Sequence, residues 1–166
     1  MNGGRVRHFA TASPADTAEF GRRLGERLSP GDAVLLTGGL GAGKSVLARG
    51  IARGLGIDRP MPSPTFALMR RYEGRVALHH FDLYRLDAAG ELYAAGLDEF
   101  MPGDGIAVVE WADRCELPLD RWIRLDIEGD VGGSSRTIAA VFFGMDREEC
   151  AADALSGWAV HDDLVD

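Results

Sequence analysis

One segment limits the folds open to this chain more than any other feature: Gly38-Gly39-Leu40-Gly41-Ala42-Gly43-Lys44-Ser45. It matches the phosphate-binding pattern G-x-x-x-x-G-K-[ST]. A strand-length apolar run, Ala33 to Thr37, precedes it, and an amphipathic segment from about Lys44 to Leu55 follows it. The alternative is a glycine-rich turn that happens to precede a helix. Because the flanking strand and helix are both present, we expect a phosphate-binding loop, or P-loop, in an α/β fold.

The chemistry of such a loop predicts the ligand. Glycines allow the backbone to curl so that successive N–H groups point at phosphate oxygens, and the helix that follows adds a partial positive charge at its N-terminus. We expect Lys44 to bridge the β- and γ-phosphates and Ser45 to give its hydroxyl to Mg²⁺, with Val46 beside them. Guanine specificity would require an Asn-Lys-x-Asp element, and the only asparagine is Asn2. The sequence therefore predicts binding of ATP or ADP with Mg²⁺.

The lysine of the loop is the only lysine of the chain, which has 17 arginines. Arginine carries a wide planar fork, whereas lysine is a compact charge on a flexible stem. A pocket closed around two phosphates needs the narrower group, and the one lysine occupies that position.

The rest of the sequence predicts a single domain with additional strands. We expect strands over 5–11, 33–37, 66–72, 75–82, 105–110, 121–128 and 135–143, and helices after Ser13, from Lys44 to Leu55, and over 88–100 with a break near Gly96. We expect the helix after Ser13 to end at Pro30-Gly31. The predicted fold class is α/β: a single-domain P-loop NTPase fold with a mixed sheet carrying additional antiparallel strands. Residues 1–145 form the ATPase domain in this prediction, and 146–166 form an acidic C-terminal helix or tail of unknown role.

Charge and composition narrow the function. Of the net charge of −8, seven acids and one arginine after Met145 supply −6, and the body has no basic surface typical of nucleic-acid binding. If the chain serves an RNA pathway, we expect another protein to hold the RNA. The apolar runs are of strand length and no signal stretch follows Met1, so we expect no membrane span and a cytoplasmic protein. Cys115 and Cys150 are expected to be two unrelated free thiols.

Two acids follow apolar strands and are candidates for the metal side of the site. Glu110 ends Ile106 to Val109, and Asp82 ends the strand through His80-Phe81. A P-loop site needs an acid near the magnesium at the C-terminal end of a buried strand. Acids in such places are often solvated turn residues, and the residues alone do not separate the two cases.

Taken together, the sequence resembles the bacterial TsaE family, formerly YjeE, the ATPase of tRNA threonylcarbamoyladenosine synthesis. The matching pieces are the P-loop, Ser63-Pro64-Thr65-Phe66, His80-Phe81-Asp82-Leu83-Tyr84-Arg85 and Val109-Glu110-Trp111, in an order and spacing that fit from about Phe9 to Phe143. The resemblance implies a cytoplasmic ATPase that acts on a complex of two partner proteins, TsaD and TsaB, which modifies the adenosine beside the tRNA anticodon.

The resemblance also implies roles for residues. It makes Glu110 the carboxylate on the magnesium side with Ser45, and it makes Asp82 the residue that positions or activates the attacking water. Thr65 would lie in a loop that senses the γ-phosphate, and Trp111 beside the nucleotide. Tyr84 and Arg85 would line the same face, where a partner could dock.

Three residue correspondences with the family are weaker, and two residues depart from the family pattern. The resemblance places Thr11 and Ser13 near the adenine and Arg136 near the nucleotide, whereas Ser13 could be only a helix cap and Arg136 only a surface charge. The family usually has an acid where Gly39 stands and often threonine where Ser45 stands. Serine keeps the metal-binding hydroxyl, while Gly39 leaves the rate of hydrolysis open.

Two other functions fit the residues. One is a nucleotide-dependent binding module with negligible hydrolysis, and the other is a small-molecule kinase. We find no arginine-rich lid insertion of the kind that such a kinase would need.

Overall fold

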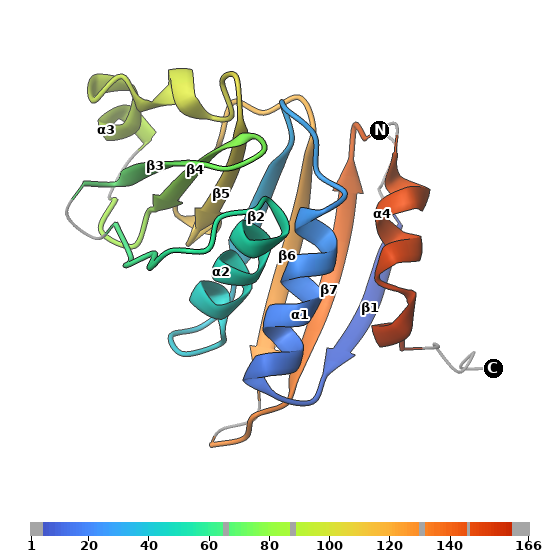
Figure 1. Ribbon diagram of the computed structural model, residues 1–166. Coiled ribbons are helices and arrows are strands. Elements are labelled where there is room, and N and C mark those ends of the chain that lie inside the picture. The colour runs from blue at the N-terminus through green and yellow to red at the C-terminus, as the bar shows by residue number, and fades with distance from the viewer. Residues whose placement is uncertain (1–4, 65–66, 87–88, 130–131, 146, 161–166) are drawn as a thin grey trace.

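The computed structural model describes residues 5–64, 67–86, 89–129, 132–145 and 147–160. Its centre is a seven-stranded mixed sheet in the order β1-β7-β6-β2-β5-β4-β3 (Figure 1). The strands are β1 (Val6–Thr11), β2 (Ala33–Thr37), β3 (Met69–Glu73), β4 (Ala77–Asp82), β5 (Ile106–Glu110), β6 (Trp122–Gly129) and β7 (Arg136–Phe143). The helices are α1 (Pro14–Gly25), α2 (Lys44–Gly54), α3 (Ala89–Ala94) and α4 (Glu148–Ala154), with short 3-10 helices over Leu97–Phe100, Ala112–Arg114 and Ser156–Trp158.

The parallel core of the sheet consists of β4, β5, β2 and β6, and antiparallel strands extend it on both sides. β3 pairs antiparallel with β4, and β7 pairs antiparallel with both β6 and β1. The two middle strands, β2 and β5, are apolar along most of their length because both of their faces are covered, and all five residues of β5 are buried. The predicted fold class, a P-loop α/β fold with additional antiparallel strands, is confirmed.

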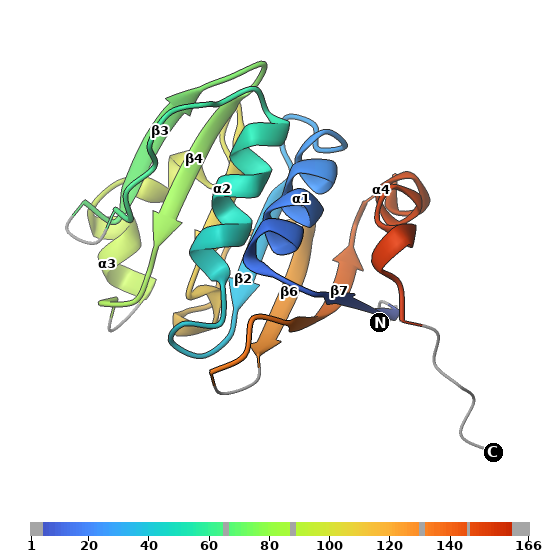
Figure 2. The same ribbon diagram turned by 60° about the horizontal axis from the view of Figure 1, so that its bottom comes forward.

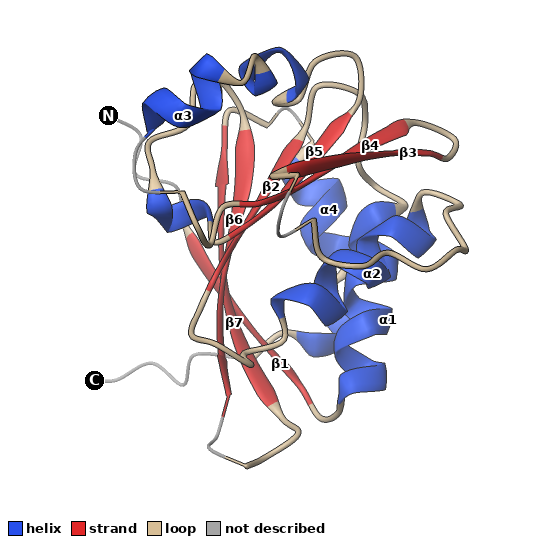
Figure 3. Ribbon diagram, turned by 90° about the vertical axis from the view of Figure 1, so that its left-hand side faces the viewer, coloured by secondary structure: helices blue, strands red, loops and turns tan. Residues whose placement is uncertain are grey.

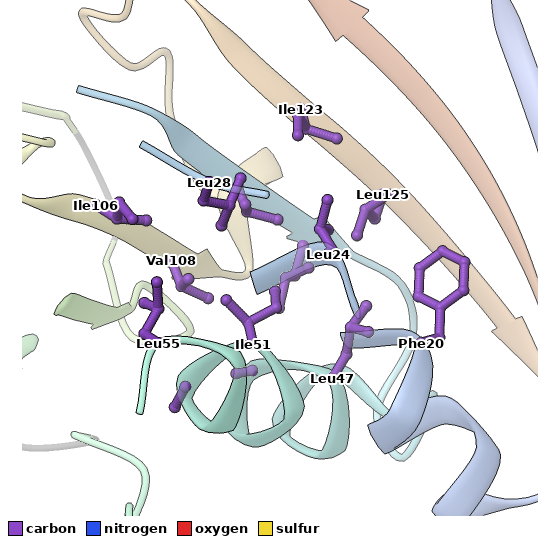
Figure 4. Packing of buried hydrophobic residues seen from close by; sticks show 14 of the residues in the cluster. Phe20, Leu24, Leu28, Leu47, Ile51, Leu55, Ile106, Val108, Ile123 and Leu125 are labelled. Carbon is purple, nitrogen blue, oxygen red and sulfur yellow. The ribbon is translucent and has the colours of Figure 1, made fainter. Parts of the chain in front are cut away.

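Helices cover the two faces of the sheet unequally. Figures 1 and 2 show α1, α2 and α4 on one face, and Figure 3 shows α3 on the opposite side of the sheet. The main core lies under α1 and α2, where Phe20, Leu24, Leu47 and Ile51 are fully buried among residues of the central strands (Figure 4). α2 therefore has a fixed position over the end of β2, which matters because the P-loop joins these two elements.

Glycines let α1 and α2 approach each other closely. A Cβ at Gly25 would overlap the carbonyl oxygen of Ile51, and a Cβ at Gly50 would overlap that of Ala18. Backbone packs directly on backbone at both points, so a side chain at either position would push the helix of the P-loop away from its neighbour.

The predicted end of the first helix was wrong. α1 begins as expected, with Ser13 as its N-cap, but it ends at Gly25 and not at Pro30-Gly31. Beyond Gly25 the chain continues as tight turns, with hydrogen bonds from Arg27 N to Leu24 O (2.9 Å) and from Leu28 N to Gly25 O (3.3 Å). Leu28 is buried although it lies outside the helix, so its apolar character reflects a packed turn.

The acidic C-terminal segment is helical over α4 and packs on the body of the protein. Ala151 and Leu155 belong to the main core, and the indole Nε1 of Trp158 donates to Asp16 Oδ1 of α1 at 2.8 Å. The isolated bridge between Phe9 and Ala159 ties the end of this segment to β1. Whether 1–145 forms a domain without it stays a prediction, and four of the acids in the predicted tail, Asp146, Asp162, Asp163 and Asp166, lie outside the described residues.

Cys115 and Cys150 are free thiols, as predicted. Among the described residues, no helix combines the length and the apolar character that a membrane span requires.

Candidate nucleotide site

The P-loop leaves the C-terminal end of β2 and turns directly into the N-terminus of α2. Gly38, Gly41 and Gly43 have φ angles of 145°, 76° and 108°, values that favour glycine. A Cβ at Gly38 would also overlap the carbonyl oxygen of Ile127, whereas a Cβ at Gly39 would meet no atom within 4 Å. No side chain caps the start of α2, so its first N–H groups are available to an anion.

Lys44 folds over this loop. Its Nζ donates to the carbonyl oxygens of Gly38 and Gly39, both at 2.7 Å, and lies 3.8 Å from the ring centroid of Trp111. Burial lowers the pKa of Lys44, although the negative charges of nearby carboxylates, foremost that of Glu110, act in the opposite direction. The ammonium group is thus held between the loop and an aromatic ring, and its contact with phosphates stays a prediction.

Glu110 is the central carboxylate of the site. Ser45 Oγ donates to its Oε1 at 2.7 Å, and His80 Nε2 lies 2.6 Å from its Oε2. The side chain is almost completely buried, with 2% of the residue exposed. Burial acts to raise the pKa of Glu110, but the hydrogen bond and charge of His80, the hydrogen bond of Ser45 and the charge of Lys44 hold it below its ordinary value. Glu110 is therefore deprotonated at neutral pH, and its oxygens could act as ligands of a metal ion.

The hydroxyl of Ser45 and the carboxylate of Glu110 are the groups that could hold a metal ion. Mg²⁺ prefers hard oxygen ligands and commonly takes one or two from the protein and the rest from phosphates and water. The two oxygens already lie within hydrogen-bond distance of each other at the start of α2. The residues present fit the predicted ion.

Asp82 lies beside Glu110 because the two residues are register partners in the parallel pair β4–β5. One carboxylate oxygen of Asp82 accepts a short hydrogen bond from Ser63 Oγ, and the other accepts from the backbone N–H of Tyr84 at 3.0 Å. Asp82 therefore ties the loop before β3 to the end of β4. Thr65, predicted to sense the γ-phosphate, lies outside the described residues.

Trp111 follows Glu110 with a φ of 57°, which is uncommon for a residue with a side chain. This backbone turn places its ring 4.8 Å from that of Tyr84, and the guanidinium of Arg114 lies 5.4 Å from the Trp111 ring. Tyr84 lines the pocket, and both Tyr84 and Arg85 are exposed. The aromatic pair forms one wall of the pocket.

A pocket of about 390 Å³ contains most of the predicted residues. It is lined by Leu40, Gly41, Ala42, Gly43, Lys44, Ser45, Val46, Ser63, Asp82, Tyr84, Glu110 and Trp111. The structure thus brings together three strand ends, the P-loop and the start of α2.

Thr11 and Ser13, predicted near the adenine, and Arg136, predicted near the nucleotide, lie outside the lining of this pocket. Arg136 is more than a surface charge, since it donates to the P-loop carbonyls of Ala42 (2.7 Å) and Gly41 (3.4 Å). Thr11 is its register partner on β1 and lines, with Arg136, a second pocket of about 310 Å³. Ser13 acts as the N-cap of α1, where its Oγ accepts from Asp16 N at 3.1 Å. Contact of these residues with a nucleotide stays a prediction.

Sequence reasoning quoted Ser63 and His80 as motif residues but gave neither a role. The signal for His80 is its spacing from Asp82, because residues two apart on a strand share a face. The signal for Ser63 was only its place in a loop, which does not indicate the partner that it contacts.

Comparison with known proteins gives a consistent result. The family model described as "Threonylcarbamoyl adenosine biosynthesis protein TsaE" matches residues 11–138, most of the chain. A protein of Bacillus subtilis (strain 168) named tRNA threonylcarbamoyladenosine biosynthesis protein TsaE is 40% identical over 116 residues, which are 68% of this chain and 72% of that protein. A protein of Nostoc sp. with the same name is 39% identical over 135 residues, which are 76% of this chain and 82% of that protein.

A solved structure is similar over almost the whole chain. The crystal structure of YdiB from Bacillus subtilis superposes with a TM-score of 0.72 at 30% sequence identity, covering 95% of this chain and 98% of that one. The similarity therefore includes the sheet, the P-loop and the helices that surround them.

Proposed function

We propose that this chain, which belongs to the TsaE family, is an ATPase whose rate of hydrolysis is raised by partner proteins. Members of this family take part in the biosynthesis of threonylcarbamoyladenosine in tRNA. In this proposal it binds ATP with Mg²⁺ in the pocket at the P-loop and hydrolyses it when the TsaD–TsaB complex is present. The tRNA is bound by that complex, and the chain acts in the cytoplasm.

The observation that carries the proposal is the hydrogen bond of 2.7 Å between Ser45 Oγ and Glu110 Oε1 at the start of α2. It places a hydroxyl and a charged carboxylate together where the P-loop would direct the phosphates. A bound Mg²⁺ would neutralise charge that develops on the phosphate oxygens. A glycine-rich turn without a ligand has no need for a buried carboxylate at this point, because the burial of a charge is costly even when the charge is paired.

The chain's own residues have separate tasks in this proposal. Lys44 exchanges the carbonyl oxygens of Gly38 and Gly39 for phosphate oxygens, and the N–H groups at the start of α2 bind the same anion. Asp82 orients the attacking water, for which Ser63 must release one of its carboxylate oxygens. Trp111 and Tyr84 close one side of the pocket.

A specific observation also favours a second candidate, the nucleotide-dependent binding module with negligible hydrolysis. Both oxygens of Asp82 already accept hydrogen bonds, from Ser63 and from the backbone of Tyr84. These hydrogen bonds use one acceptor site on each oxygen and restrict the directions from which a water can bind. In isolation we therefore expect slow turnover in either case, and the two candidates differ only when the partners are added.

The deciding experiment measures ATP binding and ATP hydrolysis in the same preparation. Calorimetry should show binding of ATP that is tighter with Mg²⁺ than with EDTA and tighter than binding of GTP. Hydrolysis should be slow for the chain alone and faster with TsaD and TsaB. Binding without stimulated hydrolysis would favour the binding module, and equal or tighter binding of GTP would reject the nucleotide assignment.

A further inference from the structure

We infer that His80 is a positioning residue, which holds the carboxylate of Glu110 in the orientation that a metal ion between Ser45 and a nucleotide requires. The inference rests on the proposed function, since it concerns the same ion site. It adds a residue from a neighbouring strand that is not itself among the residues lining the pocket but contacts one of them, Glu110.

The geometry of the contact supports this role. His80 lies on β4 and Glu110 on β5, and these strands pair in parallel with Asp82 opposite Glu110. Side chains two residues apart on a strand lie on the same face, so His80 and Asp82 share a face of β4, and the side chain of His80 reaches β5. Its Nε2 meets Glu110 Oε2 at 2.6 Å, while Ser45 Oγ donates to the other oxygen. Each carboxylate oxygen therefore has one donor on the protein side.

Burial makes this contact hard to replace by water. The side chains of His80 and Glu110 are each 3% exposed. A carboxylate accepts hydrogen bonds only, so the proton in this contact must lie on Nε2. Without the imidazole, Glu110 would be a buried carboxylate with a single donor and a freely turning plane. A partner of this kind orients a metal ligand in many sites and raises its affinity for the ion.

His79, the preceding residue, provides an internal comparison. It is completely buried like His80, but it lies on the opposite face of β4, where its Nδ1 is 2.8 Å from the carbonyl oxygen of Pro102. Its ring packs edge-on against Phe100 at 5.4 Å. The two histidines thus have the same burial and the same strand, but only His80 contacts the site.

The test compares three substitutions of His80. The terminal amide of glutamine reaches the place of Nε2 and can donate to Glu110, whereas that of asparagine is too short to do so, and leucine removes the donor. For each variant, calorimetry gives the dissociation constant of ATP with EDTA and with Mg²⁺. The first value divided by the second measures how much the ion tightens binding. We expect His80→Leu and His80→Asn to reduce this ratio by about 10- to 100-fold, and His80→Gln to keep most of it.

Controls separate this inference from general destabilisation and from the proposed function. His79→Asn and His79→Leu should lower the melting temperature but leave the ratio of the two dissociation constants unchanged. If all three His80 variants keep the wild-type ratio, or if the His79 variants lose it equally, the inference is wrong. If His80→Leu does not fold, the comparison of His80→Gln with His80→Asn decides. Should the wild-type protein show no tightening of ATP binding by Mg²⁺, the proposed function fails before the role of His80 is reached.

Discussion

Substituting Trp158 by phenylalanine tests whether the acidic C-terminal segment is part of the folded body. The indole Nε1 donates to Asp16 Oδ1 at 2.8 Å, and the other oxygen of Asp16 accepts from Ala12 N, also at 2.8 Å. The ring of Trp158 packs edge-on against Phe20 at 5.5 Å, a contact that phenylalanine can keep. The substitution therefore removes chiefly a hydrogen bond to a charged group, about 1.5–3 kcal/mol when buried. Because Asp16 is half-buried, we expect a loss near the lower end, about 1–2 kcal/mol of the free energy of unfolding.

The assay is urea unfolding followed by circular dichroism, with a melting curve beside it. For a chain of this size, a loss of 1–2 kcal/mol corresponds to roughly 3–6 °C in the melting temperature. A double-mutant cycle with Asp16→Ala should give an interaction free energy between the two residues that accounts for most of this loss. Trp122→Phe is the matched control, because Trp122 packs on the opposite face of the sheet. A stability of Trp158→Phe equal to that of wild type, or a coupling of zero with Asp16, would refute the reasoning.

Three further predictions concern the site, and a fourth concerns RNA. Lys44→Ala should weaken ATP binding in calorimetry by roughly 10- to 100-fold, the cost of a charge-assisted contact, and Lys44→Arg should not restore it because the fork does not fit the loop. Asp82→Asn should leave the dissociation constant of ATP near normal, while partner-stimulated turnover falls by about 10²- to 10⁴-fold. Glu110→Ala should instead weaken the ATP binding that depends on Mg²⁺. The opposite pattern would reverse the roles of the two acids. Gly38→Ala should lower the free energy of unfolding, measured in urea, by about 1–3 kcal/mol or more. Gly39→Asp should change it by less than about 0.5 kcal/mol, because a side chain at that position meets open space. A large loss of stability in Gly39→Asp would contradict this. The chain alone should bind tRNA only weakly at physiological salt in an anisotropy titration, and tight, salt-sensitive binding without partners would defeat that expectation.

Much of the fold could be predicted because its central elements are unambiguous in the sequence. β2 and β5 are continuous apolar runs, and the loop between β2 and α2 has a motif with one known geometry. The end of α1 could not be predicted, because Leu28 continues the apolar spacing of the helix although it lies in a turn. Spacing alone does not distinguish a buried turn from another turn of helix.

The candidate site was predictable where residues lie close in sequence and less so where it depends on strand order. The contact of Ser45 with Glu110 joins residues 65 positions apart, and it exists because β5 lies next to β2. The contact of His80 with Glu110 requires in addition that β4 be the next strand along. A sequence names the acids at strand ends, but only the order and register of the strands decide which of them face one another.

The single lysine has a consequence for the covalent chemistry of this protein. The chain carries one side-chain amine, and that amine lies in the P-loop with a pKa lowered by burial. A lower pKa leaves a larger fraction of the group as the uncharged, nucleophilic amine at a given pH. Any acylating or aldehyde reagent that reacts with a lysine side chain here therefore modifies Lys44, the residue that we propose contacts the phosphates. The yield of modification at Lys44, read by peptide mass after digestion so that the α-amino group is counted separately, would test whether an added nucleotide covers the loop.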